Sequence, residues 1–121
     1  MMLINCGSAT EARAKVDAYL RESHAAGLQV FRSRFRTARG GGRYGGHPWR
    51  TNYMIIVVRG GGRAVDAQGQ ELAVEPGQAV FWPAGDWFAF DTAPGRETEA
   101  LVLEGADLDP KQISLSATCD T

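Results

Sequence analysis

The sequence predicts a mainly β protein, an antiparallel sandwich or barrel preceded by a single α-helix. Short runs rich in β-branched and aromatic residues recur along most of the chain, about 8–12 residues apart and with no helical pattern between them. Fifteen glycines, clustered at 40–46 and 60–62, suit the tight turns of such a fold. Helical periodicity is confined to the first quarter of the 121 residues, a length that fits one core.

Residues 9–26 are predicted to form the helix, within an N-terminal segment, residues 1–27, that packs on the barrel. Ser8 to Glu11 has the pattern of a capping box, in which Ser8 is the N-cap and Glu11 reaches back to it. Gly27 provides a C-terminal stop. Apolar residues recur at helical spacing and predict one buried stripe. They are Ala12, Val16, Tyr19 and Leu20.

Residues 28–104 are predicted to form the barrel. In residues 30–37, Phe31 and Phe35 alternate with three arginines, which is typical of a half-buried strand. A run of β-branched residues ends the next predicted strand, Trp49–Val58. The remaining predicted strands are Arg63–Val65, Leu72–Val74, Ala79–Trp82, Trp87–Asp91 and Glu97–Leu103.

Two segments are not predicted to be strands. Residues 39–46, RGGGRYGG, have loop composition and are predicted to form a mobile segment able to gate a cavity. A glycine-rich phosphate loop is the alternative, although neither the Walker pattern nor the dinucleotide spacing is present. Residues 105–121 are predicted to be a tail, in which Asp109 and Pro110 have the pattern of the N-cap and first residue of a further helix.

The net charge of −1 hides an uneven distribution along the chain. Residues 23–65 hold eight arginines and no acid, whereas two bases and eleven acids follow from residue 66 onward. The favoured interpretation is that basic strands lie beside acidic ones, and the alternative is an anion site in the basic half. Arg32, Arg34 and Arg36 are correspondingly interpreted as a solvated face. Nucleic-acid binding is disfavoured, because the balance is slightly acidic and no basic recognition helix is present.

The cellular compartment is predicted from three sequence features: apolar runs, a signal peptide and the cysteines. No apolar run approaches the ~18 residues needed to cross a bilayer, and no signal peptide is evident. Cys6 and Cys119, at opposite ends of the chain, are interpreted as free thiols rather than a disulfide. We therefore expect a soluble, cytoplasmic protein without a membrane partner.

Two segments resemble the sequence motifs of the cupin superfamily. Gly77, five residues and then Pro83-Ala84-Gly85-Asp86-Trp87-Phe88 is similar to the second motif, in which a ligand histidine follows PxG. His47-Pro48-Trp49-Arg50-Thr51-Asn52-Tyr53, six residues and then Gly60 has the spacing of the first motif, which normally supplies two histidines and a glutamate. The resemblance implies a double-stranded β-helix, or jelly-roll, barrel.

The resemblance also implies that the metal site is altered. Of the four positions where a metal-binding cupin places ligands, only His47 is a ligand type, and Trp49, Tyr53 and Phe88 occupy the others. A divalent metal needs three or more N, O or S donors, so we expect neither a metal nor another cofactor. His24, the second histidine, lies on the predicted helix.

The same positions are predicted to point into the barrel, together with residues that continue their faces by alternation. Arg50 and Asn52 are weaker candidates, because a regular strand places them on the opposite face. The predicted ligand-binding set is His47, Trp49, Tyr53, Ile55, Val57, Trp82, Phe88 and Phe90.

A closer resemblance covers roughly residues 28–104. The run RTNYMIIVVRGGGRAVDAQGQELAVEPGQAVFWPAGDWFAF is similar to the effector-binding domain of AraC-type transcription regulators, which bind sugars or other small effectors in a metal-free barrel. Those regulators continue into a helical dimerisation segment and two helix-turn-helix units, and this chain ends at Thr121. The resemblance implies either the sensor part of such a regulator or a stand-alone relative.

Three functions remain open at this point. The first is a small-molecule binding domain without catalytic residues. The second is a metal-independent cupin enzyme of the isomerase or epimerase type, with His47 and Tyr53 as acid–base residues. The third is an interaction module with a filled barrel. A homodimer is expected under all three.

Overall fold

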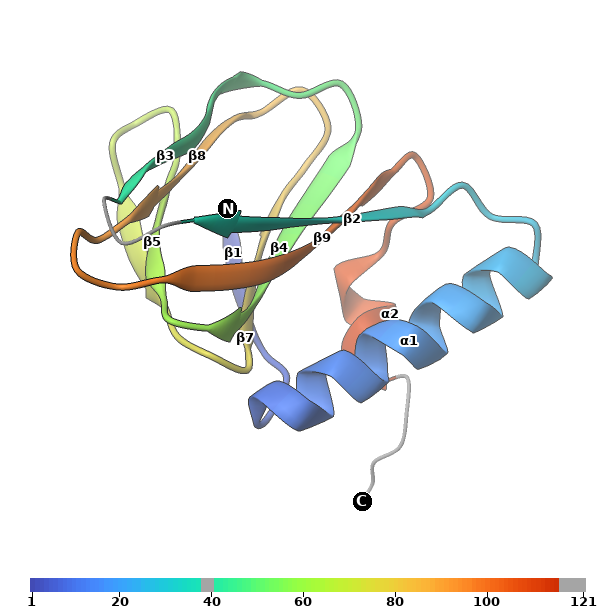
Figure 1. Cartoon of the computed structure of the whole chain (residues 1–121). Coiled ribbons are helices and arrows are strands. Elements are labelled where there is room, and N and C mark those ends of the chain that lie inside the picture. Colours follow the sequence, from blue (N-terminus) through green and yellow to red (C-terminus); the bar gives the residue numbers. More distant parts are fainter. Residues whose placement is uncertain (38–40, 116–121) are drawn as a thin grey trace.

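The computed structural model describes residues 1–37 and 41–115, and it is a small barrel of two antiparallel sheets with an N-terminal helix (Figure 1). The five-stranded sheet has the order β1-β7-β4-β9-β2, and the four-stranded sheet has the order β3-β8-β5-β6. The predicted fold class is confirmed. The elements are β1 Met2–Asn5, α1 Ala9–Ala25, β2 Phe31–Thr37, β3 Gly42–Pro48, β4 Asn52–Arg59, β5 Gly62–Val65, β6 Glu71–Val74, β7 Gln78–Trp82, β8 Trp87–Thr92, β9 Thr98–Gly105 and α2 Pro110–Leu115.

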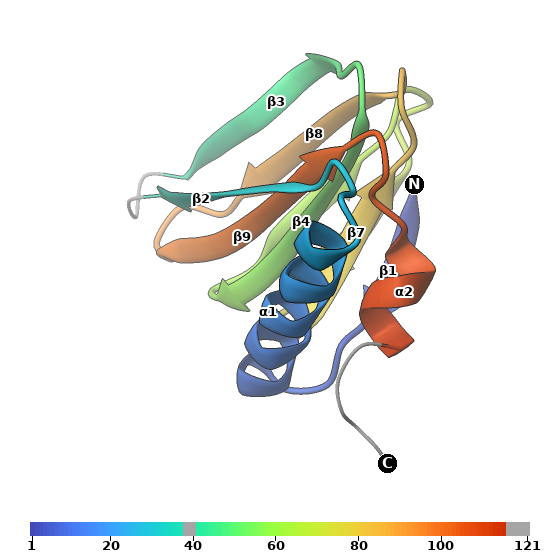
Figure 2. The ribbon, with the colours of Figure 1, turned by 90° about the vertical axis from the view of Figure 1, so that its right-hand side faces the viewer.

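Helix α1 begins at the predicted capping box. The Ser8 hydroxyl accepts from the Glu11 backbone N–H at 3.1 Å, and the Glu11 carboxylate accepts from the Ser8 N–H at 2.8 Å. The predicted stripe of α1 is buried against the outer face of the five-stranded sheet, with α2 beside it (Figure 2). Helix α2 starts where Asp109 and Pro110 predicted, and the Asp109 N–H donates to the Tyr19 hydroxyl at 2.9 Å.

Strand β4 separates two hydrophobic cores, because both of its faces are covered. Met54 and Ile56 face the helices, whereas Ile55 and Val57 face the barrel interior. This explains why the strand reads as a continuous apolar run rather than an alternating one. The helices within the described ranges are not long and apolar enough to cross a membrane.

The largest differences from the predicted elements concern three segments. The loop predicted at residues 39–46 is a strand from residue 42 onward: residues 42–48 form β3, an edge strand of the four-stranded sheet, and residues 39–40 lie outside the described ones. Strand β4 begins at Asn52, so Trp49 belongs to the turn between β3 and β4. Residues 2–5, for which no strand was predicted, pair with β7 as β1.

The basic strand β2 lies beside the acidic strand β9, as the favoured interpretation of the charge distribution predicted. Arg34 lies 3.6 Å from Glu99, and Arg36 lies 3.6 Å from Glu97. The arginine side chains are 65% and 62% exposed, so they form a solvated, ion-paired face. These exposed pairs contribute little stability, about 0–1 kcal/mol each.

Cys6 is buried between β1 and α1, and this burial raises the pKa of its thiol. The other cysteine, Cys119, lies outside the described part of the chain. That the two thiols are free therefore stays a prediction.

Candidate functional site

A cavity of about 200 Å³ lies between the two sheets. Strands β3 and β8 line it from the four-stranded sheet, and β4 and β9 line it from the five-stranded sheet. Its lining residues are Tyr44, Gly45, His47, Trp49, Tyr53, Phe88 and Glu104.

A β-bulge in β3 brings two of these side chains to the cavity. Tyr44 is paired with Phe90, and His47 is paired with Phe88, with a register shift between Gly45 and His47. Residues three apart on a regular strand point to opposite faces. The extra residue of the bulge cancels that difference, so Tyr44 and His47 both face inward.

Gly45, within the bulge, allows the strand to approach the ring of Phe88. Its φ is +90°, and a β-carbon at this position would lie 2.6 Å from Cε2 of Phe88. A larger residue would therefore displace either the strand or the ring. The glycine-rich composition of this segment serves close packing and a bulge rather than a mobile loop.

Two side-chain hydrogen bonds order the polar groups of the cavity. The indole N–H of Trp49 donates to the Glu104 carboxylate at 3.0 Å. The Tyr53 hydroxyl donates to the Tyr44 hydroxyl at 2.9 Å. Tyr53 and Glu104 are direct neighbours in the β4–β9 ladder, so the two bonds lie side by side. Glu104 is the only carboxylate, and no lysine or arginine is found, among the described residues that line this cavity.

The pKa of Tyr53 is raised above its ordinary value. Burial is the main cause, and the hydrogen bond to Tyr44 and the negative charge of Glu104 act in the same direction. The Tyr53 phenol therefore stays protonated through the neutral range. It can donate a hydrogen bond to a bound group, but it is unsuited to act as a base.

The buried phenol makes stability depend on alkaline pH. An unfolded tyrosine loses its proton near pH 10, whereas folded Tyr53 keeps it. The unfolded state then binds fewer protons, so the free energy of unfolding falls as pH rises, by about 1.4 kcal/mol per unit well above pH 10. Urea unfolding between pH 9 and 11.5 should show this slope in the wild type and a shallower one in Tyr53→Phe. Equal slopes would contradict the assignment.

The rings around the cavity contact one another. The centroid of Tyr53 lies 4.4 Å from that of Phe88 and 6.0 Å from that of Trp49. His47 meets Phe88 edge-on, at 5.4 Å between centroids. The Nδ1 atom of His47 lies 3.0 Å from the backbone carbonyl oxygen of Pro48. These spacings are those of favourable aromatic pairs, so the wall is a connected aromatic layer.

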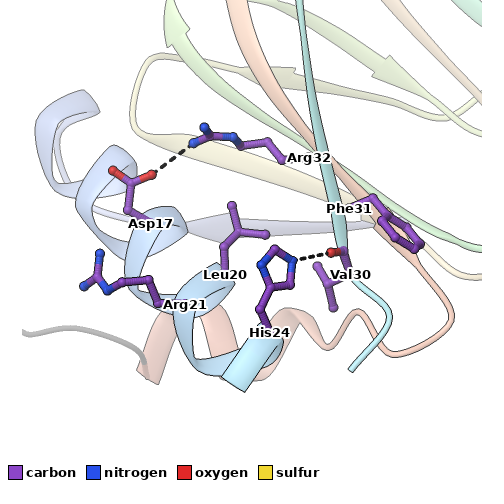
Figure 3. Close-up of a pocket in the computed structure, with 7 residues that line it drawn as sticks. All are labelled: Asp17, Leu20, Arg21, His24, Val30, Phe31 and Arg32. Carbon is purple, nitrogen blue, oxygen red and sulfur yellow. Dashed lines mark hydrogen bonds and ion pairs between the residues drawn. The ribbon is translucent and has the colours of Figure 1, made fainter. Parts of the chain in front are cut away.

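A second hollow lies on the outside of the barrel, between α1 and β2 (Figure 3). Two interactions lie along it: Arg32 donates to Asp17 at 3.0 Å, and His24 Nε2 lies 2.9 Å from the carbonyl oxygen of Val30. Arg21 also lines this groove. The groove lies on the outside of the barrel, whereas the cavity between the sheets is lined by four of the residues that the sequence predicted to bind a ligand. We take the inner cavity as the candidate site.

No family model matches the chain, and no curated protein matches it. Solved structures do match. The polyketide cyclase RemF from Streptomyces resistomycificus is 27% identical, with a TM-score of 0.57 over 69% of this chain and 58% of that one. A cupin superfamily protein from Desulfitobacterium hafniense is 16% identical, with a TM-score of 0.57 over 65% and 69%.

A cupin superfamily sugar phosphate isomerase from Silicibacter pomeroyi is 24% identical, with a TM-score of 0.56 over 69% of this chain and 55% of that one. The chain has the cupin fold. It spans little more than half the length of the cyclase and of the isomerase. Similarity to an AraC-type sensor is not among these findings, so that finer resemblance stays a prediction.

The cavity is lined by the four positions that the resemblance to the cupin motifs assigns to metal ligands, so its donors can be compared with what a metal needs. His47 and Glu104 offer one imidazole and one carboxylate, and the carboxylate is bonded to Trp49. Within the described residues, no group of three or more His, Cys, Asp or Glu side chains could hold a metal ion. The donor set does not fit a divalent metal. That the protein is metal-free stays a prediction.

The predicted ligand-binding residues divide into two layers. Four of them line the cavity: His47, Trp49, Tyr53 and Phe88. The other four are fully buried in the core beneath and do not line it: Ile55, Val57, Trp82 and Phe90.

His47 and Tyr53 do share a cavity, but not because one regular strand carries both. His47 lies on β3 and Tyr53 on β4, in opposite sheets. The side-chain amide of Asn52 bonds to Leu108 and Ala84, so it serves the fold. Arg50 lies outside the lining, with its guanidinium 5.6 Å from the Trp49 ring centroid.

Sequence reasoning missed Tyr44 and Glu104. Tyr44 was hidden in a segment interpreted as a loop. Glu104 ends an acidic strand and looks like another solvated carboxylate. What distinguishes Glu104 is that the register between β4 and β9 places it beside Tyr53. Register depends on how strands pair in the sheet, so it was not visible in the sequence.

Proposed function

We propose that this chain binds a small molecule in the cavity between its sheets. The observation that carries the proposal is an aromatic cavity that remains open above a packed core and holds a carboxylate with no ionic partner among the described residues. Binding sites for small molecules are mostly apolar, with a few polar groups that orient the ligand.

The size of the cavity limits the ligand. A cavity of about 150 Å³ takes up benzene, and drug-sized ligands occupy about 300–1,000 Å³. At about 200 Å³ this cavity suits a molecule no larger than a single ring with short substituents. The filled-barrel alternative fits only the deeper layer, where Ile55, Val57 and Phe90 are fully buried.

A thermal-shift screen of single-ring metabolites, small polyols and small amines tests the proposal. A binder at 100 times its Kd should stabilise the protein by about 2.7 kcal/mol and raise Tm by several degrees. Trp49→Leu should weaken binding of any hit about tenfold or more, because it removes both a wall and the donor to Glu104.

Trp87→Leu is the matched control, because Trp87 lies on β8 with Arg43 5.6 Å from its ring centroid and does not line the cavity. Equal losses in the two variants, or no saturable stabilisation by any compound, would count against a cavity site.

The finer role that we propose is effector binding, either as the sensor part of an AraC-type regulator or as a stand-alone relative. The motif pattern of residues 50–90 and a donor set unsuited to a metal support it. A homodimer without cofactors goes with this proposal. Sedimentation with and without a bound hit tests the dimer, and a monomer at all concentrations would remove it.

A metal-independent enzyme is the second candidate, because His47 and Tyr53 line one cavity. His47 would be the base, and the protonated Tyr53 phenol the hydrogen-bond donor. Each hit from the screen would be incubated with the protein in heavy water and followed by proton NMR. Proton exchange that disappears in His47→Ala and in Tyr53→Phe supports catalysis, and its absence in the wild type supports binding alone.

A further inference from the structure

The cavity wall presents aromatic rings from three strands and a turn. Tyr44, Trp49, Tyr53 and Phe88 line it, and the neighbouring ring pairs within this set lie 4.4–6.3 Å apart between centroids. The face of an aromatic ring carries partial negative charge and attracts a cation within about 6 Å of its centroid. In a cavity of about 200 Å³, a bound cation would lie close to several of these rings at once.

The charge in the cavity has the same sign as the ring faces. Glu104 accepts from the neutral indole N–H of Trp49, which leaves its charge uncompensated. No salt bridge to Glu104 is found in the described part of the chain, whereas Asp91 and Glu99 are paired with Arg43 and Arg34. The charge of Glu104 acts within the cavity, because it helps to raise the pKa of Tyr53.

We infer that the cavity selects a small organic cation of the quaternary or methylated ammonium class. This inference rests on the proposed function, that the cavity binds a small molecule. The cationic head would lie against the aromatic wall, beside the Glu104 carboxylate. A neutral or anionic ligand leaves that carboxylate uncompensated, and burial of an uncompensated charge is costly.

The type of cation follows from the hydrogen-bonding groups of the cavity. A primary ammonium carries three N–H donors that must be satisfied once water is removed. The acceptors offered by the side chains of the lining are few, chiefly the Glu104 carboxylate, which already accepts from Trp49, and the tyrosine hydroxyl oxygens, and most of the remaining wall is aromatic. A methylated nitrogen has few or no donors, and its methyl groups pack on ring faces.

Two soluble probes that differ only in charge test the inference. Choline and 3,3-dimethyl-1-butanol have the same shape, with a quaternary nitrogen or a quaternary carbon. Calorimetric titration at low ionic strength should give a Kd for choline at least about tenfold lower than that for the neutral alcohol, a difference of about 1.4 kcal/mol. Equal affinities, tighter binding of the alcohol, or no saturation by choline would each overturn the inference.

Charge variants locate the effect. Glu104→Gln keeps an acceptor for Trp49 and removes the charge, so it should weaken choline about tenfold and leave the neutral alcohol unchanged. Glu71→Gln removes the same charge from exposed strand β6 and should change neither. Unchanged choline binding in Glu104→Gln would overturn the inference.

The outcomes separate this inference from the proposed function. If choline does not bind, but a neutral or anionic single-ring compound does and loses affinity in Trp49→Leu, the cation inference fails and the binding function stands. If no compound binds and the cavity variants change nothing, both fail. The comparison of the two probes uses the wild-type protein alone. It can therefore overturn the inference even if a variant fails to fold.

Discussion

Replacing Phe88 by alanine is expected to lower the free energy of unfolding by about 3–5 kcal/mol. Phe88 is 2% exposed, and its ring centroid lies 4.4 Å from that of Tyr53 and 5.3 Å from that of Trp82. Truncation removes the centre of the aromatic layer and leaves a space that the surrounding β-strands cannot close. Urea unfolding followed by circular dichroism measures the loss.

Phe31 provides the matched control for this change. It is 60% exposed on the edge strand β2, and Phe31→Ala should shift stability by no more than about 0.5 kcal/mol. Similar losses in the two variants would mean that the layer around Phe88 is not a packed core. Phe88→Ala should also enlarge the cavity between the sheets, because Phe88 is one of its lining residues.

Replacing Gly77 by alanine is expected to cost about 2–5 kcal/mol. Gly77 has a φ of +90°, and a β-carbon there would lie 2.0 Å from the carbonyl oxygen of Gly7. Its carbonyl accepts from the Cys6 N–H and its N–H donates to Val57, both at 2.9 Å. The substitution therefore adds backbone strain and pushes the β1–α1 junction away from the barrel.

Gly85→Ala separates the two contributions. Gly85 has nearly the same φ, +88°, but nothing lies within 4 Å of a β-carbon at that position. The Gly85→Ala variant should therefore lose only the stability that backbone strain costs, about 1–2 kcal/mol. Thermal unfolding of the two variants side by side makes the comparison. If Gly85→Ala lost as much stability as Gly77→Ala, close approach of the N-terminal segment would not be the reason for Gly77.

Helix caps and turns, which depend on only a few neighbouring residues, were predicted well from the sequence. The capping box between Ser8 and Glu11 forms as expected, because both of its hydrogen bonds span three residues. The turns after Pro76 and Pro83 were predicted for the same reason, since proline and glycine restrict the backbone locally. The strands other than β1 and β3 were therefore predicted from composition and periodicity alone.

Strands that depend on a partner were not predictable in this way. Residues 2–5 are too few to show periodicity, and they become β1 by pairing with β7. Residues 42–48 are rich in glycine, which local propensity assigns to a loop. They become β3 because the edge of β8 offers hydrogen bonds and Phe88 leaves room only for glycine at position 45.

The sequence by itself determined the mainly β class, the N-terminal helix and the turns. Its resemblance to the cupin motifs singled out four residues that line the cavity: His47, Trp49, Tyr53 and Phe88. Only the tertiary structure decided that Tyr44 and Glu104 join them. Tyr44 faces inward through a bulge that exists only when β3 pairs with β8, and Glu104 meets Trp49 across 55 residues of chain. The physical reason is that spacing along a strand determines which face of the sheet a side chain occupies. The register between strands determines which residues become neighbours on that face.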